Sequence, residues 1–444
     1  MANTYSLMQV WDTKYEYTRY KQPVFRAFAD EKYSPGVREG ATFNREYASD
    51  LVVNQMGANG SYSVQSFTNT LDTGTVNIKE ETSIQIVEWQ KLQDHLPTQL
   101  KYTTKAANAL WLQVDANILG AMAVNAASVI DDSVINPGVG TAGNAFTVGV
   151  QNIMSVFTAG IQQFQLLNVV YDPNKTLPKD VKLETISDML AAAISPQLYN
   201  YLLQFIGGKT SLLGDEISRN GHVGKFMGYN LFVSNQLMWE GQLGLSVNPS
   251  NGDVFTLLNG VTVKGTSQAL TFTFVTGSLG TTPGNILVQG TAALTAAAVA
   301  AALNDPYTTS ASYYAFTQSS LTVWQQKLLY NTTAAVVSST TVDIQINGGG
   351  VVPVAATLTS SSNGWVSKQQ KQHNLFATSK SVSLLMQAKP HLFLNPVSGQ
   401  VARDLVTWDL YGVKVFYDQS FQIIDVQVDC SSFGAGGTPI NQFN

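Results

Sequence analysis

The pattern of apolar positions predicts one long helix near the middle of the N-terminal half. Between Thr104 and Ser128, apolar residues recur every three or four positions, which places them on one helical face: Ala107, Leu110, Trp111, Val114, Ile118 and Met122. At a rise of 1.5 Å per residue, such a helix would span about 37 Å. Thr103 or Thr104 is expected to cap its start, since threonine accepts hydrogen bonds from free helical amides.

Residues 41–78 are polar, rich in β-forming residues, and predict a long hairpin. The Asn-Gly pair within Gly57-Ala58-Asn59-Gly60 is typical of a tight turn. Each strand would have about 16 residues and reach roughly 50 Å. Few large apolar side chains share one face, so we expect the hairpin to project from the body and to rest on another surface.

Alternation of apolar and polar residues predicts further strands within 75–92 and near the C-terminus. Residues 404–417 and 421–429 are interpreted as two paired strands joined by a turn at 418–420. Two further helices are predicted at 146–169 and after Ser195, where serine is the expected N-cap and Pro196 the first helical residue. Residues 379–388 are also interpreted as helical.

The stretch from Val254 to Trp365 differs in composition from the rest of the chain. It has four charged residues in 112 positions, and turn-rich segments at 248–252 and 360–364 bound it. This contrast predicts a domain inserted into another domain. We expect it to be mainly β, with strand signals that include 312–324, one alanine-rich helix at 291–303, and the capacity to fold independently.

Overall charge and cysteine content exclude several classes of protein. Charged residues make up 12 % of the chain and the net charge is −5, whereas a dedicated nucleic-acid binder would usually be basic. The single Cys430 excludes an intrachain disulfide framework. The N-terminal sequence lacks the pattern of a signal peptide, and the longest apolar run, 292–303, is too short to span a membrane. We therefore expect a soluble protein of a reducing compartment.

Two glycine-containing motifs are weak candidates for phosphate binding. Gly138-Val139-Gly140-Thr141-Ala142-Gly143 matches a dinucleotide-binding pattern, but it follows a proline rather than a strand. Gly208-Lys209-Thr210 lacks the first glycine of a phosphate-binding loop, because Leu203 stands there. A flexible loop and a helix stop explain these glycines better.

No catalytic, cofactor or metal site is predicted. The histidines, His95, His222, His373 and His391, have no metal-ligand spacing. Cys430 is interpreted as a thiol at a strand end, and the neighbouring acids Glu80-Glu81 and Asp131-Asp132 as solvated turns. Three lysines form at most a thin basic patch: Lys368, Lys371 and Lys380. We expect neither enzymatic activity nor a cofactor, and we expect chelators to leave assembly unchanged.

Three stretches, in this order, resemble the major capsid protein of tailed bacteriophages, which has the Hong Kong 97 fold. The region from Gly40 to Ile78 is similar to the family's extended loop. Ile194-Ser195-Pro196, followed by the run from Gly221 to Asn235, resembles the family's axial-domain pattern. Leu410 to Phe416, with Ile423 to Val428, resembles its closing strands.

The resemblance implies an α+β fold with an extended loop, a spine helix, peripheral and axial domains, and an additional inserted domain. It implies the following division of the chain: an N-terminal arm at 1–40, the extended loop at 41–78, a peripheral domain at 79–180 with the spine helix at 104–128, an axial domain at 181–248, the inserted domain at 249–367, returns to the axial domain at 368–402 and to the peripheral domain at 403–430, and a C-terminal tail at 431–444.

The resemblance also implies function and partners. The chain would be a virion protein made in the host cytoplasm, and its copies would form hexamers and pentamers that close an icosahedral shell around double-stranded DNA. The implied partners are a portal protein, decoration or minor capsid proteins and, if assembly uses a scaffold, a separate scaffolding protein. No membrane is implied. Two alternatives stay open: another phage structural protein (tail tube, baseplate or decoration protein), and a polysaccharide-active enzyme.

Overall fold

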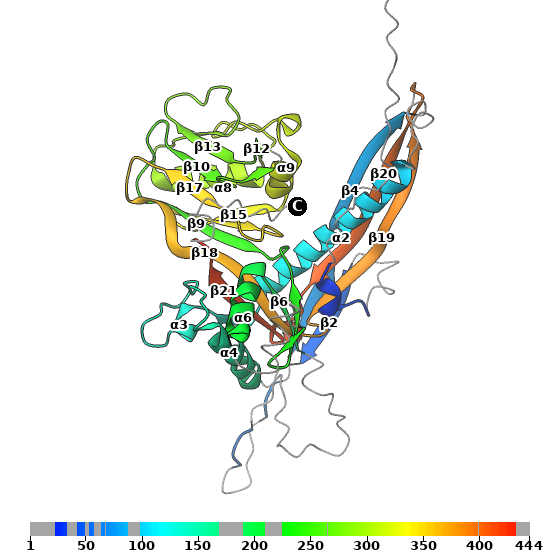
Figure 1. Cartoon of the computed structure of the whole chain (residues 1–444), viewed down its shortest axis with the longest axis vertical. Helices are drawn as coiled ribbons and strands as arrows, with labels where there is room; N and C mark the ends of the chain where they lie inside the picture. The colour runs from blue at the N-terminus through cyan, green and yellow to red at the C-terminus, as the bar shows by residue number, and fades with distance from the viewer. Residues whose placement is uncertain are drawn as a thin grey trace, which may run out of the picture.

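The computed structural model describes residues 23–32, 42–48, 53–56, 64–66, 68–87, 98–167, 190–208, 224–263, 265–397 and 399–431. The turn expected at 57–60, most of the N-terminal arm and nearly all of the C-terminal tail lie outside these residues. Two projections rise from a common base (Figure 1). One is an elongated projection, which we call the arm and which is distinct from the N-terminal arm at 1–40. The other contains most of the stretch that is poor in charge.

The arm is a four-stranded sheet covered by one long helix. Its strand order is β1-β19-β20-β4, and α2 lies along it (Figure 1). These elements have the following bounds: β1 Ala29–Asp30, β4 Ile78–Val87, α2 Thr98–Val124, β19 Val382–Pro396 and β20 Ala402–Lys414.

The predicted bounds of the long helix, 104–128, are wrong at both ends. α2 begins at Thr98 and ends at Val124, so the expected capping threonines lie inside it. The helix stops early because Ser128–Ile130 form strand β5, which pairs in parallel with strand β21 (Ile423–Asp429). Asp115, inside α2, accepts hydrogen bonds from the backbone amides of Val24 and Phe25 at 3.0 and 2.8 Å. The short helix η1 (Phe25–Ala27) is thereby fixed to α2.

Two further predictions near the C-terminus are wrong. Residues 379–388 are not helical, because a turn at Lys380, with φ of +67°, leads directly into β19. The two strands predicted to pair with each other belong to different sheets. β20 pairs with β19 and β4, β21 pairs with β18 (Asn363–Thr378) and β5, and the short helix α10 (Tyr417–Ser420) lies between them.

The central sheet has nine strands and joins distant parts of the chain. Its main path is β15-β16-β9-β18-β6-β8-β7, and β21 and β5 pair at its side. Ser195 caps helix α6, accepting a hydrogen bond from Leu198 N at 3.1 Å, which confirms the predicted start of that helix. The remaining strands and nearby helices have the following bounds: β6 Leu190–Ile194, β7 Lys225–Phe226, β8 Tyr229–Val233, β9 Trp239–Leu245, β15 Thr332–Ser338, β16 Thr341–Ile346, α3 Asp132–Ile135, α4 Ile153–Leu166 and α6 Pro196–Gly207.

The stretch that is poor in charge contains a second sheet and two α-helices. The sheet order is β14-β13-β10-β17. Instead of the strand expected at 312–324, a 3-10 turn precedes helix α9, which starts with a capping box of Thr322 and Gln325. The elements are bounded as follows: β10 Val254–Leu257, β11 Thr262–Val263, β12 Thr266–Ser267, β13 Leu270–Val275, β14 Asn285–Leu287, α8 Ala292–Asn304, η3 Gln318–Ser320, α9 Val323–Tyr330 and β17 Val354–Thr357.

The hydrophobic core of this stretch continues into the central sheet. Phe255 stacks on Phe272 with ring centroids 4.8 Å apart. Trp239 and Leu243 of β9 belong to the same buried cluster, and β16 pairs with β9 along its whole length. The stretch therefore shares both a core and a sheet with residues before position 249.

The hairpin predicted at 41–78 is present where the structure describes it. β2 (Thr42–Ala48) pairs antiparallel with β3 (Asn69–Thr75), with Thr42 opposite Thr75 and Ala48 opposite Asn69. The end of the hairpin that is farthest from its turn adjoins the arm, since β3 contacts β20.

Candidate functional site

The glycine-rich loop at 138–143 folds back on the helix before it. Asp131 caps α3, and its second carboxylate oxygen accepts a hydrogen bond from Gly143 N at 2.7 Å. A Cβ atom on Gly140 would lie 2.0 Å from the carbonyl oxygen of Asp132, so only glycine fits there. The loop follows the four-residue α3 rather than a strand, and this geometry offers no cradle for a dinucleotide.

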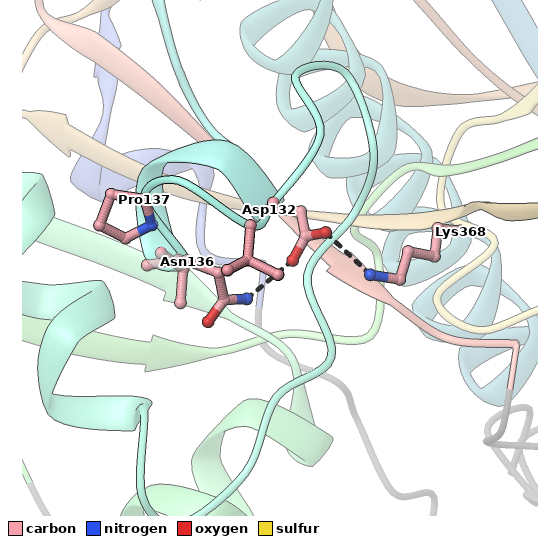
Figure 2. A pocket seen from close by; sticks show the side chains of 7 residues that line it. Asp132, Asn136, Pro137 and Lys368 are labelled. Atoms are coloured by element: carbon pink, nitrogen blue, oxygen red, sulfur yellow. Dashed lines mark hydrogen bonds and ion pairs between the residues drawn. The ribbon is translucent and has the colours of Figure 1, made fainter.

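Beside this loop is a pocket of about 420 Å³ (Figure 2). Lys368 Nζ lies 2.8 Å from Asp132 Oδ2, and Asn136 donates to the other Asp132 oxygen at 2.8 Å. Lys368 and Asn136 lower the pKa of Asp132, although burial acts in the opposite direction. The interpretation of Asp131-Asp132 as a solvated turn is wrong, because both residues are buried and hydrogen-bonded.

A cluster of five ionisable residues joins the strands of the central sheet. His373 on β18 has Nδ1 2.9 Å from Asp425 and Nε2 3.4 Å from Glu240. Lys371 Nζ lies 3.0 Å from Glu240 on β9. We call this set the His373 cluster; it comprises the following residues, all buried: Glu240, Asp343, Lys371, His373 and Asp425.

Mutual charge compensation determines protonation in the His373 cluster. Burial alone would lower the pKa of His373, but Asp425 and Glu240 outweigh it and raise that pKa to about 9. Burial alone would raise the pKa of Glu240, but His373 and Lys371 lower it to about 2. Burial, followed by the charge of Glu240, raises the pKa of Asp343 to about 6. At neutral pH, His373 is therefore a buried cation held between carboxylates.

A second polar cluster lies between the arm sheet and α2. Glu80 on β4 accepts hydrogen bonds from Asn117 on α2 at 3.0 Å and from Tyr411 on β20 at 3.0 Å. Tyr330, at the end of α9, donates to Glu80 at 3.4 Å and so joins the charge-poor stretch to the arm. Asp409 lies directly opposite Glu80 in the sheet. We call this set the Glu80 cluster; its members are as follows: Glu80, Asn117, Tyr330, Asp409 and Tyr411.

The Glu80 cluster corrects the interpretation of Glu80-Glu81 as a solvated turn. Glu80 is in a strand and only 7 % exposed, whereas Glu81 is exposed. Burial raises the pKa of Glu80, and the hydrogen bonds from Tyr411 and Asn117 only partly oppose it. Burial and the nearby charge of Glu80 raise the pKa of Asp409 to about 7. No ion pair joins either carboxyl group to a basic side chain within the part of the chain that the structure describes.

The remaining sequence candidates do not converge on one place. Cys430 is buried, donates to the carbonyl oxygen of Gln370 at 3.2 Å, and has a raised pKa because of burial. His391 packs against Trp408 with ring centroids 5.0 Å apart. Gly208 caps α6, whereas Lys209, Thr210, His95 and His222 lie outside the described residues.

The three lysines do not form a basic patch. Lys368 and Lys371 are each paired with a carboxylate, and Lys380 is in a turn before β19. Among the residues described, no group of three or more histidines, cysteines or acids is placed to hold a metal ion. No helix in the described ranges combines the length and hydropathy needed to cross a bilayer.

Polar and aromatic contacts hold the base of the hairpin on its own subunit. Arg45 Nη1 and Tyr47 Oη lie 2.6 and 2.7 Å from Asp418 Oδ1. Lys414 Nζ lies 2.8 Å from Asp72 Oδ1 on the other hairpin strand. Beyond this base, Val53 and Val64 are 97 % and 84 % exposed.

Comparison with known proteins identifies the fold. No family model and no curated protein matches the sequence. A structure from Mycobacterium phage Che8 matches with a TM-score of 0.52 at 9 % identity, covering 96 % of this chain and 98 % of the other. The capsid structure of cyanophage P-SCSP1u matches with a TM-score of 0.50 at 10 % identity, covering 96 % and 93 %.

These matches show that the chain is an α+β protein with the fold of phage capsid structures, which confirms the fold class that the sequence resemblance implied. The similarity extends over almost the whole of each chain, and so it includes the charge-poor stretch.

Proposed function

We propose that this chain is the major capsid protein of a tailed bacteriophage. The observation that carries the proposal is the match to phage structures over at least 93 % of both chains. The low content of charged residues, 12 %, supports it, because a shell subunit buries much of its surface against neighbours. The function is structural, and no step of it requires a catalytic group.

In this proposal, copies of the chain form hexamers and pentamers that close an icosahedral shell around double-stranded DNA. α2, with the bounds Thr98–Val124, is the spine helix, and the division into N-terminal arm, extended loop, peripheral, axial and inserted domains otherwise follows the ranges given above. A portal protein, decoration or minor capsid proteins and a separate scaffolding protein are the proposed partners. The chain is made in the host cytoplasm and resides in the virion.

Electron microscopy of the protein expressed alone and with its neighbouring phage genes tests this function. Closed shells, or rings of five and six subunits, are expected. Tubes, or plates of tail-like symmetry, would instead identify a tail-tube or baseplate protein. Binding only to shells formed by another protein would identify a decoration protein.

We further propose that the distal part of the hairpin is a clamp between subunits. Ordering the backbone costs roughly 1–2 kcal/mol per residue, and a lone two-stranded ribbon buries too little to repay it. The base is held by Arg45 and Asp418, whereas Val53 and Val64 face solvent in the single subunit. A neighbouring subunit can cover such side chains and pair with the strand edges.

Deletion of residues 49–68, with a two-residue Asn-Gly turn joining the strands, tests the clamp. Because the base contacts of Arg45 and Lys414 are kept, the subunit should remain folded by circular dichroism while its shells dissociate at lower urea concentration. A matched control replaces 49–68 with a flexible Gly-Ser segment of equal length, and it should weaken shells to a similar degree. Unfolding of the deleted subunit with intact shells would show that the hairpin belongs to the subunit's own core.

A further inference from the structure

The charge-poor stretch packs against one face of α2. Gln113, Ala116 and Gly120 follow each other at intervals of three and four positions, so they share a face of the helix. The residues that meet this face come from the end of α9 and from the turn that follows β16. Figure 1 shows α2 running from the common base into the arm, with α9 on the neighbouring side of the charge-poor stretch.

On this face, the side-chain amides of Gln113 and Asn331 pair with each other. Gln113 Nε2 donates to Asn331 Oδ1, and Asn331 Nδ2 donates back to Gln113 Oε1 at 3.2 Å. Asn331 is 7 % exposed, and its carbonyl oxygen also accepts a hydrogen bond from the backbone amide of Asn347 at 3.1 Å. Asn331 therefore joins α2, the end of α9 and the turn after β16.

Gly120 marks the closest approach between α2 and this turn. A Cβ atom on Gly120 would lie 2.2 Å from Asn347 Oδ1. A Cβ atom on Gly348 would likewise lie 2.8 Å from the Cβ of Ala116. Glycine is disfavoured inside a helix relative to alanine, so its place in α2 requires a reason in the packing. Here the reason is that the side chain of Asn347 lies directly against the helix.

This contact links two bodies of the molecule. α2 is fixed to the arm sheet through Asn117, which donates to Glu80 at 3.0 Å and to Tyr411 at 2.7 Å. The charge-poor stretch is fixed to the central sheet, because β16 pairs with β9. Rotation of the arm toward the charge-poor stretch would press α2 into Asn347, and rotation away from it would separate the paired amides.

We propose that this contact fixes the angle between the arm and the charge-poor stretch. We call it the α2 stop; its residues are as follows: Gln113, Ala116, Gly120, Asn331, Asn347 and Gly348. The stop opposes approach sterically and opposes separation through two hydrogen bonds. It acts within a single subunit and so does not depend on the proposed capsid function.

A consequence for assembly does rest on the proposed function. If the arm of each copy already has one direction before its neighbours bind, less conformational freedom is lost on association. Shells whose subunits lack the stop should therefore assemble at a higher protein concentration.

Pulsed electron resonance between two spin labels tests the α2 stop in the unassembled, full-length subunit. Asn395→Cys, near the end of β19, and Ser278→Cys, in the turn after β13, provide exposed labelling positions on the two bodies. Cys430 is only 3 % exposed and should stay unlabelled. The parent protein should give one narrow distribution of distances between the labels.

Two substitutions break the two halves of the stop. Asn331→Ala removes the amide pair, so the distribution should broaden toward longer distances. Gly120→Leu places a side chain where Asn347 lies and should shift the mean to a longer distance, although leucine favours the helix itself. Asn304→Ala is the matched control, because Asn304 bonds to the backbone of Ala334 inside the charge-poor stretch, and it should leave the distribution unchanged.

Gln113→Ala keeps the test decisive if Gly120→Leu does not fold. It should broaden the distribution as Asn331→Ala does, and the double variant should broaden it no further than either single variant, because all three lack the same pair. A distribution that stays unchanged in Asn331→Ala and Gln113→Ala, with the circular dichroism of the parent, would overturn the proposal, because other contacts would then fix the angle. A parent distribution as broad as that of Asn331→Ala would overturn it as well.

Discussion

The two buried polar clusters differ in how their charge is compensated. In the His373 cluster, Lys371 and His373 lie within 3.4 Å of carboxylates, and the shifted pKa values follow from that proximity. In the Glu80 cluster, hydroxyl and amide groups bond to Glu80, and among the described residues neither carboxyl group forms an ion pair. The same residue type, a strand carboxylate, is thus buried in two different electrostatic environments.

This contrast indicates how each cluster is stabilised. A buried ion pair needs no external charge when both partners belong to the protein, although removing one partner leaves the charge of the other uncompensated. A pair of carboxylates without a cation depends on protonation or on a bound ion. We therefore expect the His373 cluster to respond to removal of a charge, and the Glu80 cluster to respond to the protonation of its carboxyl groups.

Removal of the charge-poor stretch affects both clusters and should have the largest effect. Replacing 249–367 with a short Gly-Ser link removes Asp343 from one cluster and Tyr330 from the other, and it uncovers Trp239 and Leu243. Each such side chain contributes about 1.5–3 kcal/mol by burial, so a loss of about 3–6 kcal/mol is expected from these two side chains alone. Limited proteolysis and urea unfolding would measure it. An unchanged unfolding midpoint would show that 249–367 folds independently of the body.

Removing one negative charge from the His373 cluster should have the next largest effect. Glu240→Gln leaves Lys371 and His373 with too little negative charge, and it should lower the free energy of unfolding by about 3–5 kcal/mol. Lys368→Gln is the control, because Lys368 is 41 % exposed and its pairing with Asp132 should contribute only about 0–1 kcal/mol. Equal losses in the two variants would contradict the distinction between buried and surface pairs.

The pH dependence of stability should identify His373 as the buried cation. Since its pKa is raised from 6.5 to about 9, its stabilisation is complete below pH 6.5 and is lost as the pH rises through 9. The loss should amount to about 3 kcal/mol. Urea midpoints between pH 6 and 9.5 would measure it.

At acid pH, protonation of Glu240 limits the stability that the His373 cluster contributes. The lowered pKa of Glu240 means that its contribution is lost as the pH falls from 4.5 to about 2. His373→Gln should remove the alkaline slope, whereas His391→Gln, which changes a histidine outside the cluster, should keep it. A persistent slope in His373→Gln would assign the titration to another residue.

The smallest effect is expected from Thr82→Val. The substitution removes a buried hydroxyl that has no partner, so the unfolding free energy should be unchanged or rise by up to about 1 kcal/mol. Chemical denaturation would measure this. A loss of more than about 1 kcal/mol would show that the hydroxyl has a partner in the protein.

Local signals in the sequence predicted several elements correctly. Ser195 and Pro196 start α6, and the alanine-rich helix expected at 291–303 occupies Ala292–Asn304. The helix predicted at 379–388 overlaps the start of strand β19, because closely spaced apolar residues in a short run suit either a buried strand or a helix face. Tertiary pairing with β20 decided between them.

The clusters were not predictable from sequence neighbours alone. The His373 cluster combines residues more than 180 positions apart, and no local motif marks it. One signal for the Glu80 cluster was present: Glu80, Thr82, Ile84 and Ile86 alternate with exposed residues. In a strand, that alternation assigns Glu80 to the apolar face, where a solvated carboxylate is not expected.

The attachment of η1 to Asp115 has a practical consequence for engineering. The amides of Val24 and Phe25 bind one carboxylate, and Phe25 stacks on Trp111 with ring centroids 5.7 Å apart. A peptide fused upstream of Pro23 would therefore leave the molecule from a fixed point on α2. Trimming by a protease before that residue would leave the attachment intact, whereas cutting after Phe28 would release it. Residues 23–28 are therefore the segment that an N-terminal fusion has to keep for this attachment to persist.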